Sequence, residues 1–557
     1  MKAKEQKEYE ERVKHRVLIL QQLLKDGQIQ IPYNSDVEKS LLACRYDSTG
    51  EPDLSTVDGI VRSLALMAED IDYRKKSKAI ISLTEIQKRY FSYIEDNFFF
   101  FYQKMIELNI TPHQAAFRIA YGKHSTDHIQ EKIELFVNDI VDFWELHSEP
   151  AYIHIEDNYN SIKAIFGGDL FPSYSENIAS KCGIYVDTII LPCPFIRSKN
   201  LFHKWNKKEQ VYYLIKHALN ILQYKLLATA ETDFPIVAIL PDKEMLPKHD
   251  QELIMKLGND DALFHANKIF KHKFKNLEEL FDFASHLNTI DKVISEIEDE
   301  QRVLFNTDYK IPLKKQIEEE IKGQSGQLLK TRHPGKVVAA LGLGRMNVCN
   351  ELLVKSTKLG GIPLIDAPTS WEYFKWKMEY DAERTYPTKD YQSLHIGKGL
   401  TQLADTPLQW VGKIPPEGII ELHKNGALNE IRSIISEGIN DIVQSDALNF
   451  TSTSNKVFSN LNAAFIQHQK NIKTLRNKKW KIAGKDIGSW LVMGSIEVAS
   501  ACIGTPIYGL STVVLNQLFD APKLKDLPKS IVKIKETDKE RQLLKKSPIG
   551  LIFKYNK

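Results

Sequence analysis

The segment from Ile487 to Phe519 constrains this chain more than any other, because it carries a single formal charge, Glu497. Glycine, serine and alanine are frequent in it, and such small residues let two helices approach closely. The rest of the chain mixes charged and apolar residues in ordinary proportions. A segment of this composition forms either a tightly packed buried hairpin or an element directed to a membrane.

Gly504 and Pro506 divide the segment into two arms, because proline ends a helix and glycine favours a turn. As helices, the arms would be about 26 Å and about 20 Å long at ~1.5 Å per residue. Neither arm spans a bilayer core of about 30 Å comfortably. Glu497 would cost about 2.5 kcal/mol or more within lipid. We therefore predict a buried helical hairpin, with membrane insertion as the alternative.

Basic residues frame this hairpin on both sides. No acidic residue interrupts the basic run between Lys470 and Lys485, and residues 521–557 hold eleven basic and four acidic residues. Such flanks can bind a protein partner, anionic lipid or nucleic-acid phosphate. The residues that we expect at such a membrane or partner contact are Lys478, Lys479, Lys481, Glu497, Gly504 and Pro506.

The whole chain is nearly neutral, with 75 basic and 72 acidic residues among 557. This balance does not by itself call for nucleic acid. The five cysteines form no metal-binding pair, and scattered thiols suit a reducing compartment. The charged N-terminus lacks the apolar core of a signal peptide. We expect a cytoplasmic, bacterial protein.

The N-terminal residues 1–148 are expected to form a helical domain. Glu85 to Leu108 has helical periodicity, and its four consecutive phenylalanines predict a helix buried on most sides. Ser125 to Leu146 is a second amphipathic helix.

A mixed α/β region is expected over residues 149–322. Short β-branched runs predict strands at Ala151–Ile155, Ile184–Leu191 and Pro235–Leu240, and Lys207–Ala228 predicts a helix between the last two. Loop-like composition marks Gly323–Gly335 and Arg384–Pro407.

The remaining chain is divided into residues 336–383, a compact α or β-α-β unit, and residues 407–557, a helical C-terminal domain with the apolar hairpin 487–519. The expected fold is therefore mostly α with a mixed α/β middle region, in several domains.

A nucleotide site is one interpretation of residues 337–366. Val337–Leu341 would be a strand, Gly342 and Gly344 a tight turn, and Asp366 the acidic residue that binds a ribose hydroxyl at the end of a second strand. The same stretch also suits one or two buried helices. A P-loop is absent from the sequence.

Arg118 and His124 are separated by five residues in a helical region. This spacing resembles the R-x(4–6)-H motif of the HEPN family, which implies a helical ribonuclease with Arg118 and His124 as catalytic residues. His124 and His128 also share the spacing of metal ligands on one helical face, but no third ligand can be assigned, and we predict no metal.

No catalytic motif dominates the chain. The leading hypothesis is a non-enzymatic sensor or effector, in stress or phage defence, that acts through protein partners or a membrane contact of its C-terminal domain. The alternatives are a nucleotide-binding enzyme at Gly342, Gly344 and Asp366, and a ribonuclease at Arg118 and His124. We expect no cofactor and only weak support for nucleic-acid binding.

Overall fold

The computed structural model describes residues 3–33, 35–122, 126–168, 178–199, 205–242, 246–384, 391–405, 408, 413–445, 449–477, 481–482, 485–486, 539–540 and 542–554. The chain separates into two compact units. The first comprises residues 1–86 and 146–158, and the second comprises residues 87–145 and 159–557. The hairpin predicted at 487–519 lies outside the described residues.

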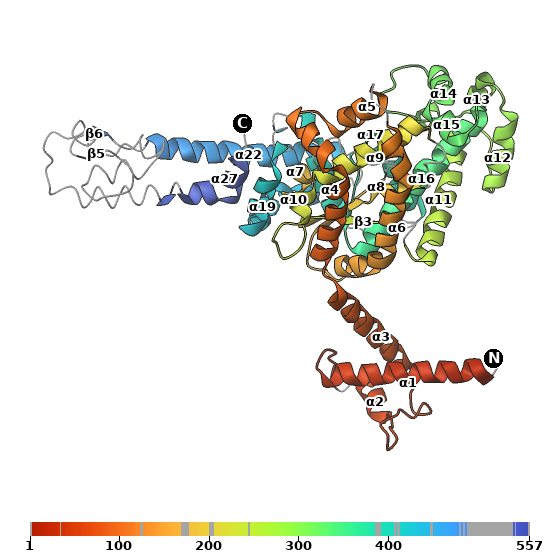
Figure 1. The fold of residues 1–557 in the computed structure, drawn as a ribbon, viewed down its shortest axis with the longest axis vertical. Helices are drawn as coiled ribbons and strands as arrows, with labels where there is room; N and C mark the ends of the chain where they lie inside the picture. Colours follow the sequence, from red (N-terminus) through yellow and green to blue (C-terminus); the bar gives the residue numbers. More distant parts are fainter. Residues whose placement is uncertain are drawn as a thin grey trace. The chain divides into compact units, whose positions relative to one another are not determined.

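The first unit is helical (Figure 1). It contains α1 (Ala3–Lys25), α2 (Asp36–Ala43) and α3 (Gly59–Ile80), together with the start of α4 and the end of α6. Val13, Val17 and Leu20 on α1 pack with Val61 and Ala65 on α3 in its core. These residues recur every three to four positions, which is why both helices bury one face here.

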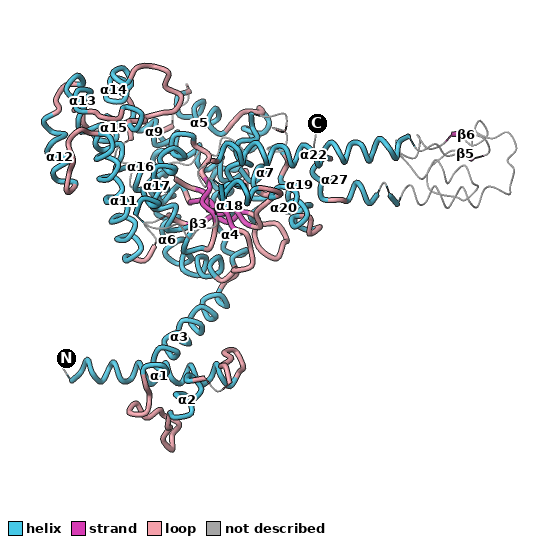
Figure 2. The backbone as a smooth tube through the Cα atoms, turned by 180° about the vertical axis from the view of Figure 1, so that it is seen from behind, coloured by secondary structure: helices cyan, strands magenta, loops and turns pink. Residues whose placement is uncertain are grey.

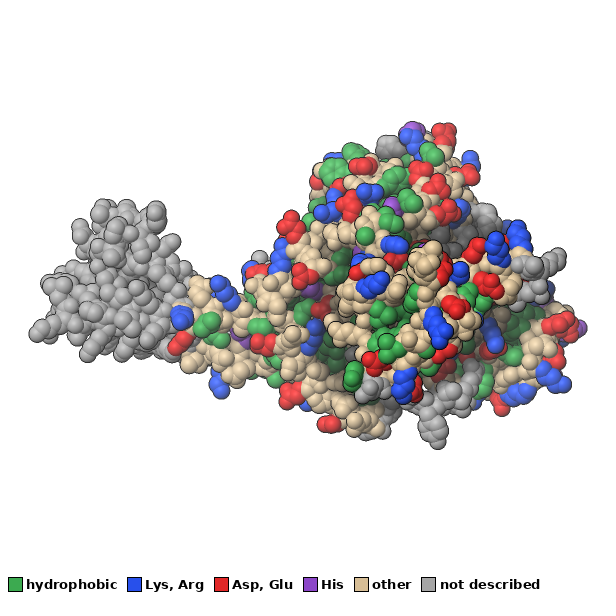
Figure 3. Space-filling model, turned by 90° about the horizontal axis from the view of Figure 1, so that it is seen from below, with side chains coloured by type: hydrophobic (Ala, Val, Ile, Leu, Met, Phe, Trp, Pro, Cys, Tyr) green, Lys and Arg blue, Asp and Glu red, His purple; other side chains and the backbone are tan. Residues whose placement is uncertain are grey.

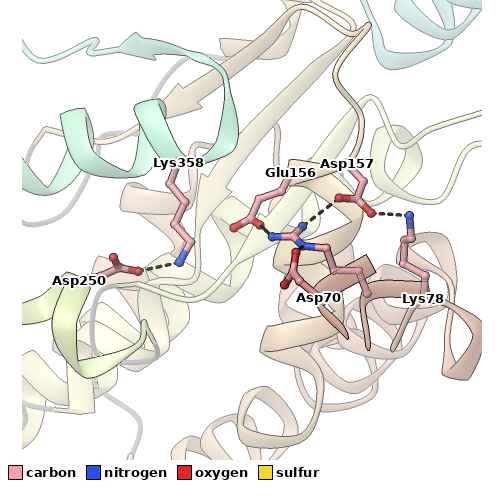
Figure 4. Close-up of polar contacts among 7 residues, drawn as sticks. Asp70, Lys78, Glu156, Asp157, Asp250 and Lys358 are labelled. Atoms are coloured by element: carbon pink, nitrogen blue, oxygen red, sulfur yellow. Dashed lines mark hydrogen bonds and ion pairs between the residues drawn. The ribbon is translucent and has the colours of Figure 1, made fainter. Parts of the chain in front are cut away.

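Arg74 on α3 holds the end of α6 within this unit. Its guanidinium lies 2.7 Å from a carboxylate oxygen of Glu156, 2.9 Å from one of Asp157 and 3.0 Å from one of Asp70. Lys78 adds a second cation to Asp157 (Figure 4). A network of this kind fixes geometry more firmly than a single surface ion pair does.

The second unit combines many helices with a small parallel sheet, which Figure 2 shows enclosed by helices. Its strands are β1 (Lys163–Phe166), β2 (Thr188–Pro192), β3 (Val237–Leu240) and β4 (Ile362–Leu364). Helices before and between the first three strands are α4 (Leu83–Glu107), α5 (Pro112–Tyr121), α6 (Asp127–Glu156), α7 (Ile178–Cys182), α8 (Pro194–Lys199), α9 (Lys207–Leu222) and α10 (Lys225–Ala228).

The connection from β3 to β4 is a helical subdomain. It contains α11 (Lys248–Ile269), α12 (Leu277–His286), α13 (Ile290–Glu296), α14 (Leu313–Lys322), α15 (Gln324–Leu329) and α16 (Pro334–Leu359). Phe270, Leu280, Val293, Ile317 and Val337 share one hydrophobic core there. Lys358 on α16 also pairs with Asp250 on α11 at 2.6 Å (Figure 4).

The chain continues from β4 as another run of helices. These are α17 (Pro368–Arg384), α18 (Tyr391–Thr401), α19 (Pro416–Lys424), α20 (Leu428–Ser436), α21 (Ile439–Ser445), α22 (Phe450–Asn477) and α27 (Pro548–Phe553), with the two-residue strands β5 (Lys481–Ile482) and β6 (Lys485–Asp486) after α22. The expected fold class, mostly α with a mixed α/β middle, is confirmed.

All four strands of the sheet run parallel, in the order β3-β2-β1-β4. Every residue of the first three strands is buried, which is typical of a parallel sheet covered on both faces. The open edge of β3 is covered by one side chain. The Gln87 amide donates to the Ile239 carbonyl at 3.0 Å and accepts from the Ile239 N–H at 2.8 Å. The edge therefore offers no free pairing at Ile239.

Several local predictions were wrong. Ala151–Ile155, expected as a strand, belongs to α6, which continues through Pro150. Val337–Leu341 is part of α16 and not a strand, so the turn expected at Gly342 and Gly344 is helical too. Phe99 and Phe100 on α4 are exposed, although the helix was expected to be buried on most sides. Tertiary packing decided each case against local propensity.

Among the described residues, α16 is the one helix that is long and apolar enough to cross a membrane, and half of its most apolar window is buried inside the protein.

Candidate ligand site at the carboxyl edge of the sheet

The strand order places a topological switch point between β1 and β4. The chain passes from β1 to β2 to β3 on one side, and β4 lies on the other side of β1. In open parallel sheets, ligands bind outside the carboxyl ends of the strands at such a point. Here β1 ends at Phe166 and is followed by Gly167 and Gly168, and β4 ends at Leu364, two residues before Asp366. This edge is the candidate site.

Gly168 lets the chain turn tightly at the end of β1. Its φ of +79° lies in the left-handed region, where glycine is favoured. A Cβ at this position would lie 2.7 Å from Cδ1 of Ile365, which is too close. Glycine at position 168 thus allows the ends of β1 and β4 to approach each other closely.

A buried ion network occupies the edge next to β2 and β3. The Arg197 guanidinium, on α8, pairs with Asp242 at 2.8 Å and with Glu351 at 2.7 Å. The Lys355 ammonium, one turn after Glu351 on α16, lies 3.4 Å from Asp242. All four side chains are buried. Two positive and two negative charges thus meet where two strands end.

The positive and negative charges of this network pair with one another. Burial alone would raise the pKa of Asp242, but Arg197 and Lys355 outweigh burial and hold that pKa below its ordinary value. The space left among the network and Gly167–Gly168 is about 10 Å³, roughly room for one water molecule. In this conformation the network fixes α8, α16 and the end of β3 together, and it leaves no room for a larger molecule.

A second charged group lies beside β4. Ile362, Leu364 and Asp366 alternate onto one face, as the two-residue period of a strand dictates. The helix α18 packs on that face: a Cβ at Gly397 would lie 3.4 Å from the Ile362 side chain and 3.9 Å from the Leu364 side chain. This packing brings Lys398 into the electrostatic neighbourhood of Asp366.

The Lys398 ammonium is the unusual member of this group. The residue is only 7% exposed, and its nitrogen lies 4.4 Å from the centre of the Trp371 ring. Within the described part of the chain, no carboxylate lies within ion-pair distance of it. A cation–π contact gives about 0.5–2 kcal/mol, which does not replace a buried counter-ion.

Two neighbouring elements bury Lys398. A Cβ at Gly399 would lie 3.0 Å from the Val457 side chain, so glycine at this position allows α22 to approach α18 closely. At Gly397 a Cβ would make only ordinary contact with β4, 3.4 Å from the Ile362 side chain, so the strand lies beside α18 without needing a glycine there. The lysine between them is thus enclosed by a strand and a helix, and its aliphatic stem is buried along its length.

Burial lowers the pKa of Lys398 to about 8. Lys375 and Lys181 lower the pKa further, whereas Asp366 and Glu372 act in the opposite direction. A lysine in this state is protonated at neutral pH but carries its charge at a cost. An anion that entered the site would find a dry, positively charged partner with little competition from water.

Cys182 on α7 lies near the same carboxylate but is no nucleophile. Burial raises the pKa of its thiol to about 12, so the thiolate is scarce at neutral pH. The four cysteines in the described residues are all free thiols. No group of three or more His, Cys, Asp or Glu side chains within the described residues has metal-binding geometry.

The structure brings one of the sequence-predicted nucleotide residues to this edge. Asp366 lies there as expected, two residues after the end of β4. Gly342 and Gly344 do not, because they are interior residues of α16. A Cβ at Gly342 would lie 3.1 Å from the His265 ring, and nothing lies within 4 Å of the Cβ position of Gly344. Gly167 and Gly168 occupy the place expected for those two glycines.

The other predicted sites remain apart from this edge. Arg118 is exposed in the last turn of α5, which ends before Gly122, and His124 lies outside the described residues. Lys478, Lys479, Glu497, Gly504 and Pro506 also lie outside them. Lys481 is described only as a residue of β5. The ribonuclease and the C-terminal contact therefore stay predictions.

The sequence offered weak signals for the residues that were missed. Lys398 stands in a Gly-Lys-Gly triplet within a stretch that was expected to be turn-rich. Arg197 and Asp242 each follow a strand that ends in Leu-Pro. Glu351 and Lys355 are spaced like a solvent-exposed helical pair, and only the fold shows that they are buried.

Comparison of the chain with family models, with curated proteins and with solved structures gives no match.

Proposed function

We propose that the second unit binds a small phosphorylated metabolite at the carboxyl edge of its sheet, with Lys398 as the charge partner of the phosphate. The observation that carries this proposal is the buried Lys398 ammonium without a carboxylate partner among the described residues. A ligand anion supplies the missing counter-charge and favours the folded state by binding to it alone.

The chemical class of the ligand follows from the neighbouring groups. Lys398 favours an anionic group, while Asp366 is an acceptor for hydroxyl hydrogens, as the acidic residue of dinucleotide folds is. A nucleoside phosphate or a sugar phosphate carries both features. The nucleotide-binding alternative from the sequence is thereby kept at Asp366, without Gly342 and Gly344, which lie inside α16.

Binding at this edge also suits the leading hypothesis of a sensor. The ends of β1 and β4, together with α16, α17 and α18, meet around the site. A ligand that favours one arrangement of these elements would shift their population. The sensor or effector role of the chain thus gains a proposed input, whereas its output through partners or membrane remains a prediction.

Thermal unfolding in the presence of candidate ligands tests the proposal. The panel contains inorganic phosphate, ribose 5-phosphate and nucleoside mono-, di- and triphosphates, with unphosphorylated ribose and nucleosides as matched controls. A ligand at 100 times its Kd stabilises the folded state by about 2.7 kcal/mol. We expect phosphorylated members to raise the melting temperature and their unphosphorylated counterparts to leave it unchanged.

Two lysine variants separate this site from general charge effects. Lys398→Met should remain folded and lose the response, whereas Lys375→Met, whose lysine pairs with Glu372 on α17, should keep it. Calorimetry at about pH 8.5 adds a second readout, because an anion beside Lys398 raises its pKa from about 8 and binding then takes up a proton. If no phosphorylated compound stabilises the protein, or Lys398→Met responds like the natural chain, the proposal is wrong.

A further inference from the structure

Helices α5 and α9 pack against each other (Figures 1 and 2). These two helices, together with the residue two positions before α9, carry a group of aromatic side chains. We call this group the aromatic platform; it consists of Phe117, Tyr121, Trp205, Tyr212 and Tyr213. The platform lies in the second unit and shares no residue with the carboxyl edge of the sheet.

Two rings of the platform are open to solvent. Phe117 is 52% exposed and Tyr121 is 41% exposed. The two residues stand one turn apart on α5. Their rings stack with centres 4.9 Å apart and an angle of 26° between planes. Exposed aromatic residues that stack in parallel keep apolar faces in water, which is costly unless something covers them.

The remaining rings hold the platform in place. Trp205 stacks on Tyr213 with centres 4.2 Å apart and 18° between planes. The Tyr212 hydroxyl lies 2.6 Å from Nδ1 of His113, so α9 and α5 are joined by a hydrogen bond between two side chains. The rings therefore form a fixed surface before any partner arrives, which reduces the entropy lost on binding.

Positive charge is interleaved with these rings. The Lys208 ammonium lies 5.9 Å from the centre of the Tyr121 ring, and the Lys216 ammonium lies 5.9 Å from the Tyr212 ring. Neither lysine forms an ion pair with a carboxylate of the described residues. Arg118 and Lys207 are exposed on the same two helices.

Acidic residues are scarce on these two helices. The only one on α5 or α9 is Glu209, whose carboxylate is engaged with the N–H of Asn206 in a capping box. Four basic residues against one acidic residue contrast with 75 against 72 in the whole chain. On the face drawn in Figure 3, by comparison, blue and red side chains are intermingled.

We infer that the aromatic platform binds single-stranded nucleic acid. Unpaired bases stack on aromatic rings such as Phe117 and Tyr121, while lysines beside the rings neutralise the phosphates. Base-paired strands hide these base faces within the duplex, so a duplex has only its phosphates to offer. A protein partner would gain the aromatic contacts but would leave Lys208 and Lys216 without counter-charges unless it were acidic.

Fluorescence anisotropy with labelled strands of about 15 nucleotides tests this inference on the full chain. The probes are oligouridine, oligothymidine, a duplex of equal length and heparin as a competitor. We expect both single strands to bind, the duplex to bind at least ten-fold more weakly, and the ratio between oligouridine and oligothymidine to show whether the 2′-hydroxyl contributes.

Variants of exposed residues distinguish stacking from charge attraction. Phe117→Ala and Tyr121→Ala should each weaken binding about ten-fold, since one stacked base is worth this much. Lys208→Glu should weaken binding and reduce the slope of log K against log salt by about one unit or more. Phe100→Ala on α4 is the matched control, because that ring is also exposed and no lysine in the described part of the chain lies over it.

Three results would contradict binding of single-stranded nucleic acid at the aromatic platform. Undetectable binding at low salt contradicts the inference, as does equal affinity for duplex and single strand with an unchanged Phe117→Ala variant. Loss of binding in the Phe100→Ala control would also contradict it. Melting temperatures of the variants confirm that they remain folded, which is expected because both substituted rings of α5 are exposed.

Discussion

Replacing Lys398 by methionine should stabilise the ligand-free protein. The pKa of this lysine falls from its ordinary 10.5 to about 8 in the folded protein. Each pKa unit corresponds to about 1.36 kcal/mol, so the buried charge costs roughly 3 kcal/mol at neutral pH. Methionine is unbranched and apolar, so it fills the space of the lysine stem without a charge. The substitution also removes the cation–π contact with Trp371, and this loss offsets about 0.5–2 kcal/mol of the stabilisation. We therefore expect a net stabilisation of about 1–2.5 kcal/mol.

The dependence on pH identifies the cause. Below about pH 8, Lys398 is protonated in both the folded and the unfolded chain, and the cost is fully present. Between about pH 8 and its ordinary pKa of 10.5, the folded chain has released the proton and the unfolded chain still holds it. Stability contributed by this site therefore rises with pH in that interval. The advantage of Lys398→Met should shrink over the same interval.

Urea unfolding at pH 7, 8, 9 and 10 measures this difference, with Lys375→Met as the matched control. Lys375 is about one-third exposed and pairs with Glu372, so its replacement should change stability by less than about 1 kcal/mol. A Lys398→Met protein that is less stable than the natural chain at pH 7 would refute the reasoning. A stability difference that stays constant from pH 7 to pH 10 would refute it as well.

Three further substitutions test the fold around the site. Gln87→Leu leaves the buried N–H and C=O of Ile239 without partners, at about 1–3 kcal/mol for each group, and should increase hydrogen exchange at the Ile239 amide. Asp242→Ala should lower the free energy of unfolding, measured by urea titration, by about 3–5 kcal/mol, because it leaves buried cations without a counter-charge. The control Asp291→Ala removes a carboxylate from an exposed ion pair and should lower the free energy of unfolding by less than about 1 kcal/mol. Burial lowers the pKa of His265 to about 3, so the folded chain resists a proton that the unfolded chain accepts below about pH 6.5, and stability falls as pH drops through this interval. His265→Gln should flatten that fall, as unfolding midpoints between pH 6.5 and pH 4 will show.

Periodicity predicted the long helices well because their burial is one-sided. Residues such as Ile133, Phe136, Ile140 and Trp144 recur on one face of α6 and are all buried. The segment Lys207–Ala228 likewise corresponds to α9 and α10. Strand prediction was less secure. β1 spans only Lys163–Phe166, too short for a periodic signal, and the β-branched run at 151–155 is held in α6 by its helical neighbours.

The candidate site could be predicted only at Asp366, which follows a strand. The burial of Lys398 depends on β4, which lies beside Gly397, and on α22, which approaches α18 closely at Gly399. These partners lie far away in the chain, so their approach is a property of the tertiary fold. In the sequence, Arg197 and Lys355 cannot be distinguished from the exposed charged residues of any helix. Their function becomes visible only when the strand ends are brought together.

The side-chain amide of Gln87 affects how the sheet forms during folding. It makes the hydrogen bonds to Ile239 that a neighbouring strand would otherwise make, and it belongs to α4, which precedes all four strands in the chain. A growing polypeptide emerges from its N-terminal end, so α4 is already synthesised when β3 appears. The helix can therefore cover the edge strand during synthesis, before that edge meets a second chain with which it could aggregate.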